Sequence, residues 1–169
     1  MRERLFFFAI VFGTMLVEAR RASLNERAQR ARGGVEPAGD VYKIMRIVYP
    51  GVFLAMSVEG TVRATAAPAA MLAGAALFVA AKCLKWWAIV SLGRFWTFRV
   101  IVVPGARLVA AGPYRWLRHP NYVGVMGELA GAALVAGAPL TGMAGIATFG
   151  WLIVQRVSVE DRALREAAH

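Results

Sequence analysis

One short stretch of the sequence holds most of the residues that suit chemistry. Residues 112–124 read GPYRWLRHPNYVG and place Arg115, Arg118 and His119 directly before Pro120. Because proline is favoured in the first turn of a helix, Pro120 predicts a helix that begins here and fixes these side chains at its entrance. A helix N-terminus offers free N–H groups and partial positive charge, so the place suits an anion such as a carboxylate. Anchoring of lipid headgroups by the arginines is the alternative interpretation.

Three further residues of interest follow this stretch. Glu128 falls inside an apolar run, where a costly charge indicates either a functional residue or a paired structural one. Arg156 and Glu160 are four residues apart in QRVSVEDRALREAA and therefore share a helix face. This spacing is typical of ordinary surface pairs, but alternating membrane helices would bring both residues to the same membrane face as His119. The sequence thus predicts a polar site at one membrane surface.

The composition indicates a membrane protein, since 59% of the 169 residues are hydrophobic. Four apolar runs approach the roughly 20 residues that a spanning helix needs, and a fifth is shorter; they are residues 41–58, 68–87, 122–138, 140–154 and 5–17. The fifth resembles a signal peptide, but Arg20 and Arg21 follow it at once and favour a retained helix. We expect an all-α integral membrane protein with about five transmembrane helices.

The segments between the apolar runs predict smaller elements. Residues 18–41 are rich in arginine and predict a short interfacial helix followed by a loop. The β-rich residues 98–103, the turn signal Pro104-Gly105 and residues 107–111 predict a small cytoplasmic β-hairpin. The last helix is expected to run past the membrane as a cytoplasmic extension.

The charges set the expected orientation and exclude several classes of function. Seventeen of the twenty Lys and Arg fall on one side if five helices alternate, so that side is expected in the cytoplasm, against anionic headgroups, with the N-terminus outside. The net charge of +10 is therefore no sign of nucleic-acid binding, and nucleic-acid motifs are absent from the sequence. One cysteine and two histidines exclude an intrachain disulfide and argue against a metal site. No feature points to an obligate protein partner.

Together, GPYRWLRHPNYVG and the downstream RVSVED resemble the isoprenylcysteine carboxyl methyltransferase family of membrane enzymes. The resemblance is strongest over residues 92–164, where LGRFW, RVIVVPGARLV, RHPNYVG, Glu128 and Arg156 with Glu160 occur in family order. Before residue 92 it rests on the helix layout and on a basic loop. The family's paired glutamates are Glu160-Asp161 in this chain.

The resemblance implies one membrane methyltransferase domain over residues 1–169, with N-terminal helices and a basic loop in 1–91 and a cofactor-binding part in 92–169. It implies S-adenosyl-L-methionine as methyl donor, held between the last two membrane helices and the cytoplasmic segments. His119 and Arg118 would be catalytic. The implied cofactor pocket consists of Arg118, His119, Pro120, Tyr122, Gly124, Glu128, Arg156 and Glu160. Charge complementarity agrees, since arginine suits the cofactor's carboxylate and glutamate its ammonium.

The expected acceptor is a lipophilic molecule with a carboxylate or a phenol, such as an isoprenoid, a polyketide or a prenylcysteine-like compound. A carboxylate needs no general base, whereas a phenol does, and His119 is the candidate. The Arg-, Ala- and Gly-rich composition favours a bacterial inner membrane, with the active site facing the cytoplasm. The alternatives are a phospholipid or amine N-methyltransferase, a related membrane reductase that uses a nicotinamide cofactor, and a non-enzymatic transporter or scaffold.

Overall fold

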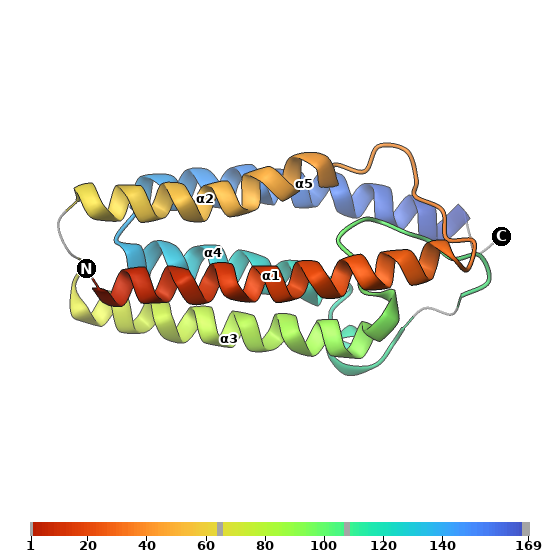
Figure 1. Ribbon diagram of the computed structural model, residues 1–169, viewed down its shortest axis with the longest axis horizontal. Coiled ribbons are helices and arrows are strands. Elements are labelled where there is room, and N and C mark those ends of the chain that lie inside the picture. Colours follow the sequence, from red (N-terminus) through yellow and green to blue (C-terminus); the bar gives the residue numbers. More distant parts are fainter. Residues whose placement is uncertain (1, 64–65, 107–108, 167–169) are drawn as a thin grey trace.

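The protein is an elongated bundle of five long helices that run alternately in opposite directions (Figure 1). The computed structural model describes residues 2–63, 66–106 and 109–166. The elements are α1 (Arg2–Arg30), α2 (Tyr42–Val62), α3 (Pro68–Leu92), η1 (Gly93–Phe95), η2 (Gly112–Arg115), α4 (Pro120–Ala136) and α5 (Pro139–Glu166), where η marks a short 3-10 helix. The α1–α2 and α3–α4 connections and the end of α5 gather at one end of the bundle, which we call the loop end (Figure 1).

Proline and glycine mark several of the helix boundaries, including the predicted start at Pro120. α3 begins at Pro68 and ends at Leu92, and the capping residue Gly93 has a φ of +57°, a conformation that glycine adopts without strain. α4 begins at Pro120, and His119 is the residue directly before it. The predicted all-helical class is therefore confirmed for the described residues.

The first helix differs from its prediction. A short span at 5–17 and a separate interfacial helix were expected, but α1 continues without a break from Arg2 to Arg30. Its polar second half is held by tertiary contacts: the Asn25 side-chain amide donates to the backbone oxygens of Gly93, at 3.1 Å, and of Trp96, at 2.7 Å. These partners are distant in the sequence, so local composition gave no sign of them.

The predicted β-hairpin is not found in the described part of the loop, and this prediction was wrong. Val102 instead exchanges two backbone hydrogen bonds of 2.9 Å with Val35, which form an isolated antiparallel bridge between the two connections. Residues 107–108 of the expected second strand lie outside the described residues. An isolated two-stranded hairpin is only marginally stable. The Val35–Val102 bridge instead connects the α1–α2 and α3–α4 connections.

By length and hydropathy, two of the described helical segments qualify as membrane spans, namely Pro68–Phe95 and Pro139–Glu166. The expected count of five spans is not supported by this criterion. α4 has only 17 residues, and α1 carries many charged side chains.

Glycines allow α3 and α4 to pack with their backbones nearly in contact. A Cβ added at Gly131 would lie 2.7 Å from the backbone oxygen of Gly74, and one at Gly124 would lie 2.9 Å from Cβ of Lys85. Both of these glycines of α4 therefore face α3. Gly142 of α5 faces α4, where a Cβ would lie 2.5 Å from Cβ of Ala133.

Candidate functional site

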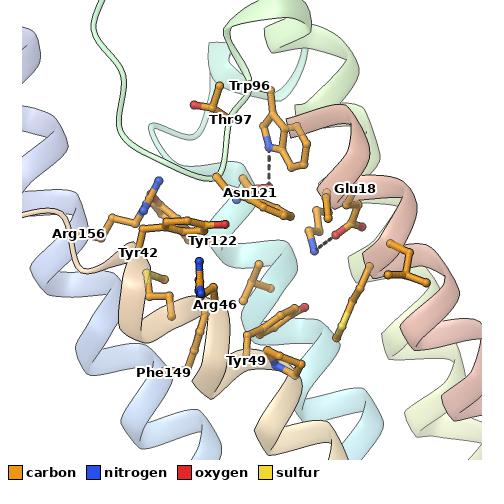
Figure 2. A pocket seen from close by; sticks show the side chains of 18 of the residues that line it. Glu18, Tyr42, Arg46, Tyr49, Trp96, Thr97, Asn121, Tyr122, Phe149 and Arg156 are labelled. Carbon is orange, nitrogen blue, oxygen red and sulfur yellow. Dashed lines mark hydrogen bonds and ion pairs between the residues drawn. The ribbon is translucent and has the colours of Figure 1, made fainter. Parts of the chain in front are cut away.

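A cavity of about 460 Å³ lies inside the loop end of the bundle, and all five helices contribute to its wall. Trp96 and Thr97, from the connection after η1, cover it on one side (Figure 2). The next residue, Phe98, also lines the cavity, and these three residues form its cover. Tyr49 of α2 and Phe149 of α5 lie on the opposite side (Figure 2). Most of the wall is aromatic or aliphatic, and its volume is within the range of roughly 300–1,000 Å³ that is typical of small-molecule sites.

Arg156 is the centre of the polar part of this wall. Its Nε donates to the hydroxyl of Tyr122 at 2.7 Å, and its Nη1 donates to Oδ1 of Asp40 at 2.9 Å. The Tyr122 hydroxyl in turn donates to Oε2 of Glu160 at 3.0 Å. The expected pair of Arg156 and Glu160 is therefore bridged by Tyr122.

Asp40 fixes both connections to α5, and the sequence analysis did not identify it. Besides contacting Arg156, its Oδ1 accepts a 3.0 Å hydrogen bond from the backbone N–H of Tyr42, at the start of α2. Its Oδ2 accepts a 2.8 Å bond from the backbone N–H of Val100. One carboxylate thus holds the α1–α2 connection, the α3–α4 connection and α5 in one arrangement.

His119 lies beside the last turns of α5, as the sequence predicted. Its ring stacks on Tyr122 at a centroid distance of 5.5 Å. Nδ1 is 3.9 Å from Oε2 of Glu160, and Nε2 is 3.5 Å from Oδ1 of Asp161. Nε2 is buried and makes no hydrogen bond to the described residues. The bend before α4 and the tail of α5 therefore meet at the loop end.

A cluster of buried charges lies next to the cavity, between α1, α3 and α4. Nζ of Lys82 is 2.8 Å from Oε1 of Glu128, and Nζ of Lys85 is 2.7 Å from Oε2 of Glu18. The crossed pairs, Lys82 with Glu18 and Lys85 with Glu128, are both at 3.2 Å. The Tyr49 hydroxyl donates a hydrogen bond to Glu128. Two cations thus face two anions, and the charges balance inside the bundle.

Glu128, whose charge within an apolar run was either functional or paired, is a paired charge in the structure. Both lysines point into the bundle, where each forms an ion pair with a buried carboxylate. The sequence held two signals: Lys82 and Lys85 share a helix face at i and i+3, and Glu18 directly follows an apolar run.

Comparison with known proteins decides the family. Residues 74–166 match the family model described as the isoprenylcysteine carboxyl methyltransferase (ICMT) family. The chain belongs to this family. The resemblance seen in the sequence is confirmed, and the protein is a membrane methyltransferase, the activity for which the family is named.

Two relatives match along most of their length. The "Uncharacterized protein YpbQ" of Bacillus subtilis is 30% identical over 159 residues, which cover 94% of each chain. An "Uncharacterized protein" of Haemophilus influenzae is 22% identical over 141 residues, 83% of this chain and 82% of the relative. No solved structure matches the chain.

Of the eight site residues that the family resemblance implied, the structure brings some to the cavity and places the others away from it. Tyr122 and Arg156 line the cavity, and His119 and Glu160 lie behind Tyr122. The other four predicted residues lie elsewhere: Arg118 is exposed and 3.5 Å from Asp161, Pro120 is buried at the start of α4, Gly124 packs on α3, and Glu128 belongs to the charge cluster. The position of Gly124 indicates a packing role, because any side chain there would collide with Lys85.

Asn121, within the stretch 112–124, and two residues of α2 also line the cavity. The two α2 residues were not predicted, because α2 is far from that stretch in the chain. Asn121 holds the cover in place, since its Oδ1 accepts a 3.3 Å hydrogen bond from Nε1 of Trp96 (Figure 2). Tyr42 and Arg46 line the cavity from the first turns of α2. An arginine one turn inside an apolar helix was the available signal.

Proposed function

We propose that this protein is an S-adenosyl-L-methionine-dependent O-methyltransferase that acts on a lipophilic acceptor. Membership of the ICMT family supports methyl transfer. The observation that carries the rest is the cavity itself. It joins a charged end at Arg156 to a wall of apolar and aromatic side chains, so it offers places for both a polar cofactor and an oily acceptor.

The residues around Tyr122 fit the amino-acid end of the cofactor. Arg156 suits the carboxylate and Glu160 the ammonium, because charge-assisted hydrogen bonds are the strongest polar contacts available. The buried Nε2 of His119, which lies 3.5 Å from Asp161 but makes no hydrogen bond to the described residues, is a further polar atom that a ligand would satisfy. The aromatic faces of Trp96 and Phe98 suit a purine. When bound, the cofactor supplies an electrophilic methyl group.

The protein's own task is to align the acceptor and exclude water. Such alignment is worth roughly 7–11 kcal/mol in favourable cases. The cover formed by Trp96, Thr97 and Phe98 shields the cavity on its loop side. A carboxylate acceptor requires no proton transfer. For a phenol, His119 is the residue that we propose as base, with Arg118 at the surface beside it.

We place the loop end in the cytoplasm of a bacterial cell, with the N-terminus outside and all five helices crossing the inner membrane. The alternating helix directions gather most Lys and Arg at the loop end, where anionic headgroups attract them (Figure 1). Isoprenoid, polyketide and prenylcysteine-like acids or phenols, which dissolve in the bilayer, are the acceptor classes that the apolar wall suits.

Two experiments test this function. Titration of the purified protein with S-adenosylhomocysteine should raise its thermal stability, because a ligand that binds only the folded state stabilises it by mass action. No shift at saturation would favour a scaffold. Incubation of membranes with a donor that carries a labelled methyl group, followed by mass spectrometry of the extracted lipids, should then identify the acceptor and show whether oxygen or nitrogen is methylated.

A further inference from the structure

Three cationic side chains line the cavity, and they differ in their partners. Lys85 lies between Glu18 and Glu128, and Arg156 is bound by Asp40 and Tyr122. Arg46 also lines the cavity, but its side chain has no hydrogen bond or ion pair to any residue in the described ranges. Its guanidinium is exposed, and no carboxylate in the described ranges pairs with it, so it is available to bind an anion at the edge of the cavity.

Arg46 stands where the cavity opens sideways. Three of the residues that line the cavity are also exposed on the bundle surface, namely Leu16 and Ala19 of α1 and Arg46 of α2. Leu16 is 73% exposed. The opening therefore lies between α1 and α2, on the flank of the bundle rather than at the loop end. With all five helices crossing the membrane, as proposed above, this flank faces lipid.

The positions of the two arginines assign them different ligands. Arg156 lies near Glu160 and His119, which suit the cofactor. Arg46 lies at the flank, among Met45, Tyr49 and Pro50. Figure 2 shows its side chain directed into the space beside Tyr42 and Tyr122. The cation at the flank is thus placed for a molecule that arrives from the bilayer.

We propose that Arg46 and the α1–α2 opening form an anion subsite that holds the ionised oxygen of an amphipathic acceptor whose apolar part lies toward the bilayer. The inference rests on the proposed function and adds the residue that recognises its acceptor, a lipophilic carboxylic acid or acidic hydroxyl. Methylation removes the charge that Arg46 binds, so the neutral product is held more weakly than the acceptor. The same arginine then selects the substrate and favours release of the product.

The test uses ω-bromododecanoate and its methyl ester as probes of the acid and of the neutral product. The full-length protein is placed in phosphatidylcholine nanodiscs at about pH 8.5, where the acid is ionised. Bromine quenches tryptophan fluorescence on contact, and Trp96 lines the cavity. We expect the wild type to bind the acid roughly tenfold more tightly than the ester, since a charged hydrogen bond is lost with the ester.

Variants assign this preference to one residue. Arg46→Gln should bind both probes with the affinity of the ester, whereas Arg46→Lys should keep much of the preference. Lys43→Gln is the matched control, because Lys43 is an exposed cation on the same turn of α2 that does not line the cavity. A preference that persists in Arg46→Gln, or its absence in the wild type, would overturn the proposal.

Binding of S-adenosylhomocysteine separates the two proposals. We expect Arg46→Gln to bind it as the wild type does. If Arg46→Gln instead loses this affinity while its preference for the acid is unchanged, Arg46 serves the cofactor and the subsite is refuted. If the wild type fails to bind S-adenosylhomocysteine but prefers the acid through Arg46, the subsite stands and the methyltransferase assignment falls.

Discussion

Asp40 accepts a 2.9 Å hydrogen bond from the guanidinium of Arg156, although 116 positions separate the two residues in the sequence. Both side chains are almost inaccessible, with 3% and 6% exposed. The pair joins the α1–α2 connection to α5 at the wall of the cavity. The shape of the proposed cofactor end therefore depends on a loop residue from the first third of the chain.

Replacing Asp40 by asparagine should weaken its interaction with Arg156 while changing the shape of the side chain little. The amide oxygen still accepts from the backbone of Val100, but the negative charge beside Arg156 is lost. Breaking a buried ion pair costs on the order of 3 kcal/mol, and we expect a corresponding fall in thermal stability in detergent. Glu166→Gln, an exposed change near the end of α5, should have almost no effect. Equal stability of the Asp40 and Glu166 variants would contradict this role.

His119→Ala and Glu160→Ala are each expected to lower the affinity for S-adenosylhomocysteine by about tenfold, the effect of one lost polar contact. Both residues lie at the loop end outside the apolar core, so folding and membrane insertion should be unaffected. Isothermal titration measures the affinity, and Arg162→Ala, an exposed change on the same tail, is the control. Undiminished affinity in both variants would remove these residues from the site.

The buried charge cluster predicts a rescue between two substitutions. Glu128→Gln leaves Lys82 and Lys85 facing Glu18 alone, and this uncompensated charge should cost roughly 3–5 kcal/mol of folding free energy. Adding Lys85→Met restores one cation to one anion and should recover at least half of that loss. Thermal unfolding of the single and double variants provides the comparison. Additive losses would show that charge balance is not what holds the cluster.

Close packing of α3 on α4 predicts opposite effects for two glycines. Gly131→Ala places a Cβ 2.7 Å from backbone atoms of α3, which cannot give way as a flexible side chain does, so a loss of about 1–3 kcal/mol is expected. Gly13→Ala is the matched control in α1, where no atom lies within 4 Å of the added methyl. It should be neutral or stabilise the helix by up to about 1 kcal/mol. Urea or thermal unfolding distinguishes the two signs.

The stability of the folded protein should depend on pH through Glu36, which lies at the loop end. Burial raises the pKa of this carboxyl, but hydrogen bonds from Arg99, at 2.7 Å, and from Arg30 outweigh that effect, and the pKa lies below its usual value. The folded state therefore binds the proton less tightly than the unfolded chain. The stabilisation is complete above the unfolded pKa, about 4.3, and is lost as the pH falls through the folded one.

The wild type should consequently be more stable than Glu36→Gln near neutral pH, and this difference should shrink in acid. Thermal unfolding of both proteins across the acid range measures it. A difference that does not change with pH would mean that the carboxylate's charge contributes nothing to holding the connection.

Much of the helical layout was predictable because it depends on local features of the sequence. Long apolar runs marked four of the five helices, and Pro68, Gly93 and Pro120 marked their ends. The meeting of His119 with the tail of α5 was also predictable, since alternating helices bring both to the same end.

The remaining features depend on contacts between distant segments. α1 was cut short in the prediction because Glu18 begins a polar stretch, and its partners Lys82 and Lys85 lie on another helix. The hairpin was wrong because β propensity does not identify a partner, and Val102 pairs with Val35. Arg46 and Asp40 were not predicted, because they reach the site only through the tertiary packing of α2 and the α1–α2 connection beside α5.

The buried position of Glu18 also constrains how the protein is made. The ribosome completes α1 before it has synthesised either lysine that neutralises Glu18, and Glu128 emerges later still. Glu18 is therefore without its counter-charges until the third helix has been made. The ion pairs that join α1 to α3 can form only after that point, so the first helix reaches its final packing late in synthesis.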